Sequence, residues 1–286
     1  MCRFALYLGA EITVSSLVTE PIYSIIHQSF HSHEREEPLN GDGFGLAWYV
    51  PEMAKGPAIF KDVTPAWNNI NLLNLARVTR SSCIMAHVRA ASPGLAVTQL
   101  NCHPFSWGLF AFMHNGVVAG FQRVRRALLE RLSDEAFHLI RGSTDTEYVF
   151  ALFVDHYRRI SAGQGRIEAM ATALTAAIAA VEELAQEARV TAPSLLNLAV
   201  SDGSCAVVSR YISRDPEKAN SLYVHTGSRY VCSDGLCRMM EPGTGTGAVI
   251  VASEPLSEDE GWMRVQPNCL LLVHKDLKVE MRDIEC

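Results

Sequence analysis

Apolar runs of strand length dominate the first 120 residues of the chain. A nearly continuous apolar run extends from Cys83 to Val88, and another extends from Leu109 to Met113. Continuous runs of this length are typical of strands that are covered on both faces. Shorter strands are predicted at residues 3–8, 44–50 and 58–61. This part of the chain therefore predicts a sheet whose strands are joined by glycine-containing turns.

Helical periodicity replaces this pattern in the middle of the chain. Helices are predicted at residues 69–80, 121–132 and 146–160. The first of them carries Ile70, Leu73 and Val78 on the side expected to be apolar. A long amphipathic helix follows, marked by apolar residues three and four positions apart: Ile167, Met170, Leu174, Ile178, Val181 and Leu184. After Pro193, strands return at residues 195–200, 205–210, 222–225, 247–252 and 269–273.

The order of strands, helices and strands again predicts one α+β domain over residues 2–286, with no repeat and no long linker. Two packed antiparallel sheets with helices outside would form a four-layer α/β/β/α sandwich. A two-layer α+β domain would give a similar order of elements, so the pattern alone leaves both architectures open.

Composition and charge narrow the class of protein. The 286 residues are 48% hydrophobic and 20% charged, which is ordinary for a globular chain. A net charge of −6 and the lack of a Lys/Arg run argue against nucleic-acid binding. No apolar stretch approaches the ~20 residues that span a bilayer. Without a signal-peptide pattern at the N-terminus, we expect a cytoplasmic protein with no membrane partner.

The cysteines and a small histidine group are the candidate metal ligands of the chain. In a chain without an export signal, the eight cysteines are expected to be reduced thiols. Cys232 and Cys237 flank a segment typical of a turn between strands, and no second Cys pair completes a zinc cage. His27, His31 and His33 are interpreted as helix-end and loop histidines. We therefore expect no metal and no cofactor.

Cys2, directly behind the initiator methionine, is the first candidate for chemistry. Removal of Met1 would leave one residue with both a thiol and a free α-amino group, which titrates near ~7.7–8.0. Such an amino group can accept the thiol proton, as in enzymes with an N-terminal Thr. The predicted strand that follows would fix the nucleophile in space. A small apolar residue at the start of a strand is the alternative interpretation.

Three further segments carry groups that a thiol attacking a carbonyl would need. Asn115 and Gly116 follow a predicted strand and could both donate to an oxyanion, although Asn-Gly is also a strong turn signal. Arg89, next to small residues at a strand end, could clamp a carboxylate or be a solvated surface charge. Asp145 precedes a helix and could hold a substrate ammonium group, and Thr144 or Asp145 could equally be an N-cap.

Together these motifs resemble the class II glutamine amidotransferases, which are N-terminal-nucleophile hydrolases. Five motifs occur in the family's order along residues 2–255: Met1-Cys2, Asn40-Gly41-Asp42-Gly43-Phe44-Gly45, Ala86-His87-Val88-Arg89, His114-Asn115-Gly116 and Ser143-Thr144-Asp145-Thr146-Glu147. The resemblance implies the four-layer sandwich. It also implies that Cys2 is the nucleophile and that Asn115 with Gly116 forms the oxyanion hole. Arg89 would bind the α-carboxylate of the substrate and Asp145 its α-amino group.

The chain is most similar to the short, stand-alone branch of that family, which shares the Met-Cys-Arg start and the late element Val251-Ala252-Ser253-Glu254-Pro255-Leu256. That branch includes γ-glutamyl hydrolases of the ergothioneine pathway and uncharacterised bacterial glutaminase-like proteins. Larger relatives add a domain that consumes ammonia, and no such domain fits here. The expectation is hydrolysis of a γ-glutamyl amide through a Cys2 thioester, with ammonia, cysteinylglycine or a larger thiol metabolite as leaving group. The alternative is a non-catalytic or ammonia-supplying subunit, so a protein partner or homo-oligomer stays open.

Overall fold

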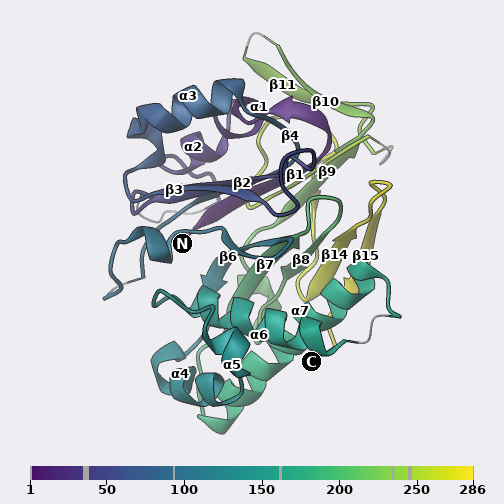
Figure 1. Cartoon of the computed structure of the whole chain (residues 1–286). Helices are drawn as coiled ribbons and strands as arrows, with labels where there is room; N and C mark the ends of the chain where they lie inside the picture. The colour runs from purple at the N-terminus through teal and green to yellow at the C-terminus, as the bar shows by residue number, and fades with distance from the viewer. Residues whose placement is uncertain are drawn as a thin grey trace.

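Two antiparallel sheets packed face to face form the centre of the molecule, and helices cover the outer face of each sheet (Figure 1). This computed structural model describes residues 2–34, 39–92, 94–160, 163–233, 235–243 and 247–285. The four layers are those of the α/β/β/α sandwich, so the predicted fold class is confirmed and the two-layer alternative is wrong.

The first sheet has seven strands, in the order β13 (Met263–Arg264), β9 (Tyr223–Gly227), β12 (Ala248–Ala252), β1 (Arg3–Thr13), β4 (Arg80–Val88), β2 (Phe44–Trp48) and β3 (Ala58–Asp62). Its outer face is covered by α1 (Ser15–Val18), α2 (Ile25–Gln28) and α3 (Ile70–Val78). A separate hairpin, β10 (Arg229–Ser233) with β11 (Leu236–Met240), lies at the end of this layer (Figure 1).

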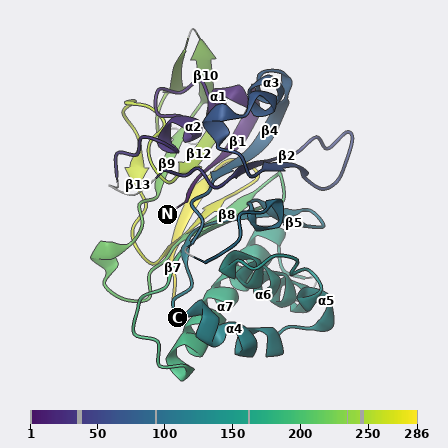
Figure 2. The same cartoon turned by 90° about the vertical axis from the view of Figure 1, so that its left-hand side faces the viewer.

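The second sheet has six strands, in the order β15 (Val279–Asp283), β14 (Cys269–Val273), β8 (Ala206–Arg210), β7 (Leu195–Ser201), β6 (Phe110–Val117) and β5 (Phe105–Trp107). Its outer face is covered by α4 (Phe121–Glu130), α5 (Asp134–Phe137), α6 (Asp145–Arg159) and α7 (Arg166–Glu187). Figure 2 shows these four helices gathered on one side of the molecule. Three short 3₁₀ helices are η1 (Ala66–Asn68), η2 (Gln99–Asn101) and η3 (Pro216–Lys218).

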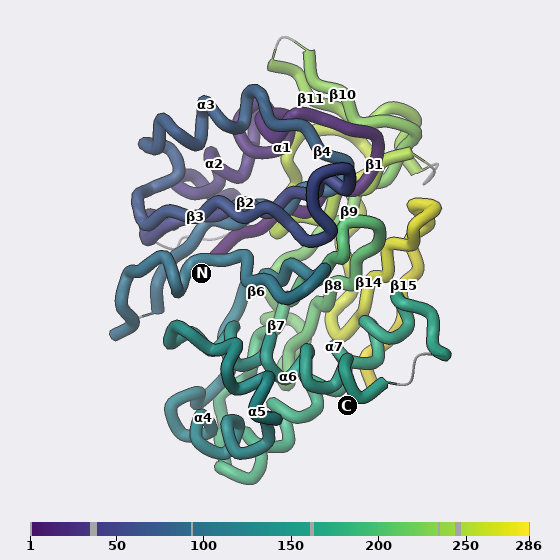
Figure 3. Tube along the Cα trace, viewed as in Figure 1, coloured from purple at the N-terminus to yellow at the C-terminus, as the bar shows by residue number. Residues whose placement is uncertain are grey.

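The alternation of side chains along β1 decides which residues face the other sheet. Phe4, Leu6 and Leu8 are buried in the apolar layer between the sheets, whereas Ala5 and Tyr7 pack toward the helices of the first sheet. Because successive side chains of a strand point to opposite faces, Cys2 continues the row that faces the second sheet. The tube in Figure 3 shows the start of β1 at the boundary between the two halves of the molecule.

Two sequence predictions need correction. The helix predicted at 69–80 exists as α3, but Ile70 and Val78 are 71% and 73% exposed, and the residues buried against the sheet are Leu72 and Ala76. The strand predicted to end at Met113 continues as β6 to Val117. Among the described helices, none is long and apolar enough to cross a membrane.

Candidate active site

Cys2 lies immediately before β1, the central strand that is paired on both sides with β12 and β4. Its side chain is half-buried, and its thiol donates to the carbonyl oxygen of Ala90 at 3.6 Å. Burial raises the pKa of the Cys2 thiol above its ordinary value, although the positive charge of Arg89 acts in the opposite direction. The thiol therefore needs a base before it can act as a nucleophile.

Arg89 follows directly after β4, and only 3% of it is exposed. Its backbone N–H donates to Gly43 O at 2.8 Å, and its Nη1 donates to Asp42 O at 3.3 Å. The Nη2 atom is buried and has no hydrogen-bond partner in the described part of the chain. A solvated surface charge is thus the wrong interpretation of Arg89. Its unpaired nitrogen is a buried donor, and leaving such a donor without a partner is energetically costly.

The glycine-rich segment before β2 holds this arginine in place. The Asp42 carboxylate accepts from Ala91 N at 2.8 Å, so the loops on both sides of Arg89 are tied together. Gly43 has a φ of +110°, and a Cβ there would lie 2.6 Å from Cys102 Sγ. Only glycine fits this conformation in this space without strain. The motif at residues 40–43 therefore positions Arg89.

The segment His114-Asn115-Gly116 lies inside β6, where Asn115 pairs with Asn197 and Gly116 with Leu196 on β7. The Asn-Gly turn considered from the sequence is therefore wrong. A Cβ on Gly116 would lie 1.8 Å from Leu195 O and 2.7 Å from His114 Nε2, so only glycine fits. Ala111 and Met113 face the layer between the sheets, and alternation places the Asn115 side chain on that same face, toward the row that contains Cys2.

Asp145 is the first residue of α6 and remains partly exposed. One carboxylate oxygen accepts from Val118 N at 2.8 Å and the other from Thr146 N at 2.8 Å. Thr144 occupies the N-cap position, but its hydroxyl makes no cap hydrogen bond and is buried without a partner among the described residues. Backbone donors thus fix the Asp145 carboxylate at the N-terminus of α6, and the side chain remains partly accessible to solvent.

Cys2, Arg89, Gly116 and Asp145 come together around one cavity of about 340 Å³. That volume is in the range of small-molecule sites. Asn115 is not among the residues that line the cavity, whereas its two neighbours are. The lining residues are Cys2, Arg89, Ala90, Ala91, Ser92, Leu95, His103, His114, Gly116, Val117, Thr144, Asp145 and Thr146. The segment 92–106 contributes several of these residues, and no described residue of 51–57 or 226–246 does.

Sequence reasoning missed the histidines beside this cavity. His103 Nδ1 lies 2.7 Å from His87 Nε2, which is also 3.1 Å from His114 O. Burial lowers the pKa of His103 well below its ordinary value and that of His87 to about 3. His87 and His114 stand within the quoted motifs, but the contact of His87 with His103 depends on the fold of the 92–106 loop, and its contact with His114 O depends on the packing of the two sheets.

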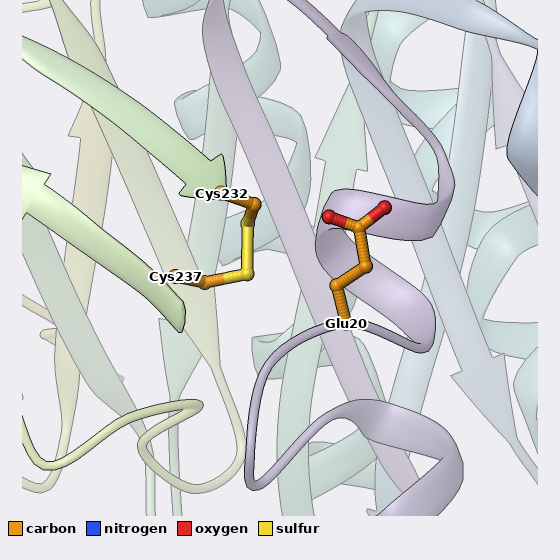
Figure 4. A group of neighbouring side chains, drawn as sticks. All are labelled: Glu20, Cys232 and Cys237. Carbon is orange, nitrogen blue, oxygen red and sulfur yellow. A yellow bond between two sulfur atoms is a disulfide. The ribbon is translucent and has the colours of Figure 1, made fainter. Parts of the chain in front are cut away.

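One pair of cysteines departs from the expectation of reduced thiols. Cys232 and Cys237 are directly paired across the β10–β11 hairpin and form a disulfide, as Figure 4 shows. The two flanking segments pair as antiparallel strands, and residue 234 of the connection between them lies outside the described residues. Glu20 lies beside the disulfide, and these three residues are the only group of possible metal ligands that lie together among the described residues. Their two sulfur atoms are bonded to each other. Buried free thiols elsewhere are Cys83, Cys102, Cys205 and Cys269.

Comparisons with known proteins agree with this geometry. The family model described as "Glutamine amidotransferases class-II" matches residues 15–283. The chain is 40% identical over 294 residues to the "Probable glutamine amidotransferase DUG3" of Saccharomyces cerevisiae, covering 96% of this chain and 82% of the yeast protein. It is 26% identical to the "Gamma-glutamyl-hercynylcysteine sulfoxide hydrolase" of Mycolicibacterium smegmatis over 263 residues, covering 92% of this chain and 91% of that protein.

Solved structures show the same fold. A glutamine aminotransferase class-II domain protein from Silicibacter pomeroyi superposes with a TM-score of 0.68 at 26% identity, and the match covers 100% of both chains. Other solved amidotransferase domains share the two-sheet architecture. The family match over most of the chain, the extended identity to the yeast protein and the common fold agree, and the chain belongs to the class II glutamine amidotransferase family of enzymes, close to γ-glutamyl hydrolases.

Proposed function

We propose that this chain hydrolyses the γ-glutamyl amide bond of glutamine, or of a γ-glutamyl peptide or thiol metabolite, through a thioester on Cys2. The observation that supports this most strongly is the convergence of Cys2, Arg89, Gly116 and Asp145 on one cavity, from four separate segments of the chain. The name of the mycolicibacterial relative, a hydrolase of a γ-glutamyl compound, agrees with the same class of substrate.

The charged groups of the cavity suit the α-carboxylate and the α-ammonium group of an amino acid. The unpaired Nη2 of Arg89 would donate to the substrate's α-carboxylate, since guanidinium and carboxylate form short, charge-assisted bonds. The carboxylate of Asp145 would accept from the α-ammonium group. With both of these α-groups bound, the γ-carbonyl carbon of the substrate would be directed to the Cys2 thiol.

The chemistry then needs only groups of the chain and water. After Met1 is removed, the α-amino group of Cys2 accepts the thiol proton, and the thiolate attacks the γ-carbonyl carbon. The oxyanion accepts hydrogen bonds from the Asn115 side chain and the Gly116 backbone N–H. The amine leaves with a proton from the α-ammonium group, and a glutamyl thioester remains. Water then attacks this thioester, glutamate is released, and the thiol regains its proton.

The free α-amino group is central to this proposal. Because burial raises the pKa of the Cys2 thiol, little thiolate forms unaided at neutral pH. An α-amino group with a pKa near ~7.7–8.0 is partly neutral at that pH and can take the proton. A non-catalytic or ammonia-supplying subunit of a larger complex is the alternative. The hydrolase is favoured over it, because a scaffold has no need of separate residues that bind the α-carboxylate and the α-ammonium group of an amino acid.

The decisive experiment compares two forms of the protein against a panel of substrates. N-terminal mass spectrometry first identifies one sample that begins at Cys2 and another that retains Met1. Both are assayed for released glutamate with glutamine, glutathione and γ-glutamyl amines. We expect release only from the form that begins at Cys2. Equal activity of the Met1-retaining form would exclude the amino group as base, and inactivity of the processed form on every substrate would favour the subunit alternative.

A further inference from the structure

Ser253 and Glu254, which follow β12 directly, are bound to the start of β1. Ser253 N donates to Phe4 O at 2.9 Å, and Ser253 Oγ accepts from Phe4 N at 3.0 Å. These two bonds extend the contact between β12 and β1 by one residue, to Phe4, two residues after Cys2. Both residues are buried, with 0% and 2% of their surface exposed. Nothing in the clamp or the thioester chemistry explains why the late Ser253-Glu254 motif lies here.

Ser253 also contacts the carboxamide of Asn115. The Nδ2 atom of Asn115 lies 3.3 Å from Ser253 Oγ, while Oδ1 is buried without a partner among the described residues. Oxygen and nitrogen of a carboxamide exchange places on a half-turn, and the hydrogen-bond network decides between the two orientations. With Oδ1 toward Ser253, the hydroxyl donates to Oδ1 while still accepting from Phe4 N. The unpaired oxygen then has a partner, and the NH₂ group is free to donate to an oxyanion.

Glu254 binds Arg3, the first residue of β1. Its carboxylate accepts from Arg3 Nε at 2.7 Å, from Ser32 Oγ at 2.5 Å and from His33 N at 2.9 Å. The Nη1 atom of Arg3 in turn donates to the carbonyl oxygen of Cys2 at 3.0 Å. The backbone of the nucleophile is therefore held by a guanidinium whose own position is fixed by a buried carboxylate.

We propose that Ser253 and Glu254 are positioning residues, the first for the Asn115 carboxamide and the second, through Arg3, for Cys2. Adjacent in sequence, they fix the oxyanion donor and the nucleophile relative to each other. This inference rests on the proposed function, because it assigns Asn115 and Cys2 the roles given above.

A double-mutant cycle of Ser253→Ala and Asn115→Ala tests the first half. Loss of an oxyanion donor lowers kcat by about 10²–10³-fold, and we expect that loss in Asn115→Ala. Ser253→Ala should lower kcat by about 10-fold or more, with KM within about two-fold of the native value, because only orientation in the transition state is lost. In the Asn115→Ala background, Ser253→Ala should change kcat by less than about two-fold. Ser253→Thr, which keeps the hydroxyl, should recover most of the activity.

Glu254→Gln tests the second half and should behave differently in the same cycle. Because it acts through Cys2, its loss in kcat should persist in the Asn115→Ala background. Ser209→Ala is the matched control, since Ser209 is a buried serine that bridges Leu198 N and Leu196 O in the other sheet. It should lower the melting temperature without lowering kcat.

The outcomes separate this inference from the proposed function. If Asn115→Ala keeps a normal kcat, the oxyanion role in the proposed function fails. If Asn115→Ala is impaired but Ser253→Ala costs the same factor in both backgrounds, or costs nothing, only the positioning role of Ser253 is overturned. A loss in Glu254→Gln that disappears in the Asn115→Ala background would overturn the role of Glu254.

Discussion

The imidazole rings of His87 and His103 meet edge to face, with 2.7 Å between His87 Nε2 and His103 Nδ1. A carbonyl oxygen can only accept, so His87 Nε2, at 3.1 Å from His114 O, carries the proton that both neighbours share. His103 Nδ1 is then an acceptor, and its proton lies on Nε2. Both rings are neutral in this arrangement, which agrees with the effect of burial on their pKa values.

The neutral state of His87 predicts a pH-dependent stability. In the unfolded chain a histidine titrates near ~6.5, whereas burial lowers the pKa of folded His87 to about 3. Below pH ~6.5 the unfolded state binds a proton that the folded state does not, so stability is lost as pH falls from there toward 3. His87→Gln should reduce the slope of the unfolding free energy by about 1.3 kcal/mol per pH unit near pH 5.

Urea unfolding at pH 7, 6 and 5 measures this slope. The exposed His138 provides the control, because His138→Gln makes the same substitution outside the core. An unchanged slope in His87→Gln would show that His87 takes up its proton in the folded state as easily as in the unfolded one.

Cys2→Ala should abolish hydrolysis while the fold stays intact. Only a thiolate can form the thioester, and the half-buried thiol makes one hydrogen bond, to Ala90 O. Cys2→Ser should be severely impaired, because a hydroxyl holds its proton far more tightly than a thiol. Glutamate release and circular dichroism measure the two properties. Cys205→Ala, at a buried thiol just before β8, should lose some stability but keep its activity. Glutamate release by Cys2→Ala would remove Cys2 as the nucleophile.

The elements could be predicted from the sequence where apolar content decides the outcome. The run from Cys83 to Val88 is buried on both faces, so its composition alone indicates a central strand and places Arg89 at its end. Helix α3 shows the limit of this reasoning. It carries two apolar stripes, Ile70 with Leu73 and Leu72 with Ala76, and periodicity does not tell which of them packs against the sheet. The smaller stripe, Leu72 with Ala76, is the one buried in the core beneath the first sheet's helices.

The candidate site was predictable where one short motif carries one group, as at Cys2, Arg89 and Asp145. Contacts between motifs could not be predicted from the sequence, because they depend on which strands become neighbours. The Ser253–Asn115 hydrogen bond joins residues 138 positions apart, and it follows from the pairing of β12 with β1 and the packing of β1 against the second sheet. The Cys232–Cys237 disulfide has a similar origin, since the register of β10 and β11 sets the two residues directly opposite each other.

The buried ion pair of Arg3 and Glu254 predicts a large loss of stability when one partner is removed. The side chains are 4% and 2% exposed, and 2.7 Å separates Nε from Oε1. Glu254→Leu removes the buried carboxylate that accepts from the Arg3 guanidinium and should cost about 3–5 kcal/mol of unfolding free energy. The double variant Arg3→Met with Glu254→Leu should lose less than Glu254→Leu alone, because both charges of this pair are then removed together.

Urea unfolding of the three proteins measures these differences. Asp215→Asn serves as the control, because it removes one partner of the Lys218–Asp215 pair, whose side chains are 73% and 63% exposed. Exposed pairs of this kind contribute at most about 1 kcal/mol. A double variant that is less stable than Glu254→Leu would mean that Arg3 is stabilised mainly by its other contacts, such as that with Ser32.

Arg89 predicts how the enzyme should distinguish substrates. A guanidinium paired with an α-carboxylate makes charge-assisted hydrogen bonds worth about 1.5–3 kcal/mol each. Lys cannot reproduce the planar fork, so Arg89→Lys should raise KM for a γ-glutamyl substrate by about 10- to 100-fold. For the same reason, substrates esterified at the α-carboxylate should be poor substrates of the native enzyme.

Kinetics of native and Arg89→Lys enzyme on the free acid and on its α-ester complete a cycle of four combinations. The variant should discriminate less between acid and ester, because the group that reads the carboxylate is degraded, so the two losses should be less than additive. This cycle tests the role of the Arg89 Nη2 atom, which is buried and has no partner among the described residues. Fully additive losses would mean that Arg89 does not touch the carboxylate. The unpaired nitrogen would then serve a different anion in the cavity, and the carboxylate would have to be bound by other residues of its lining.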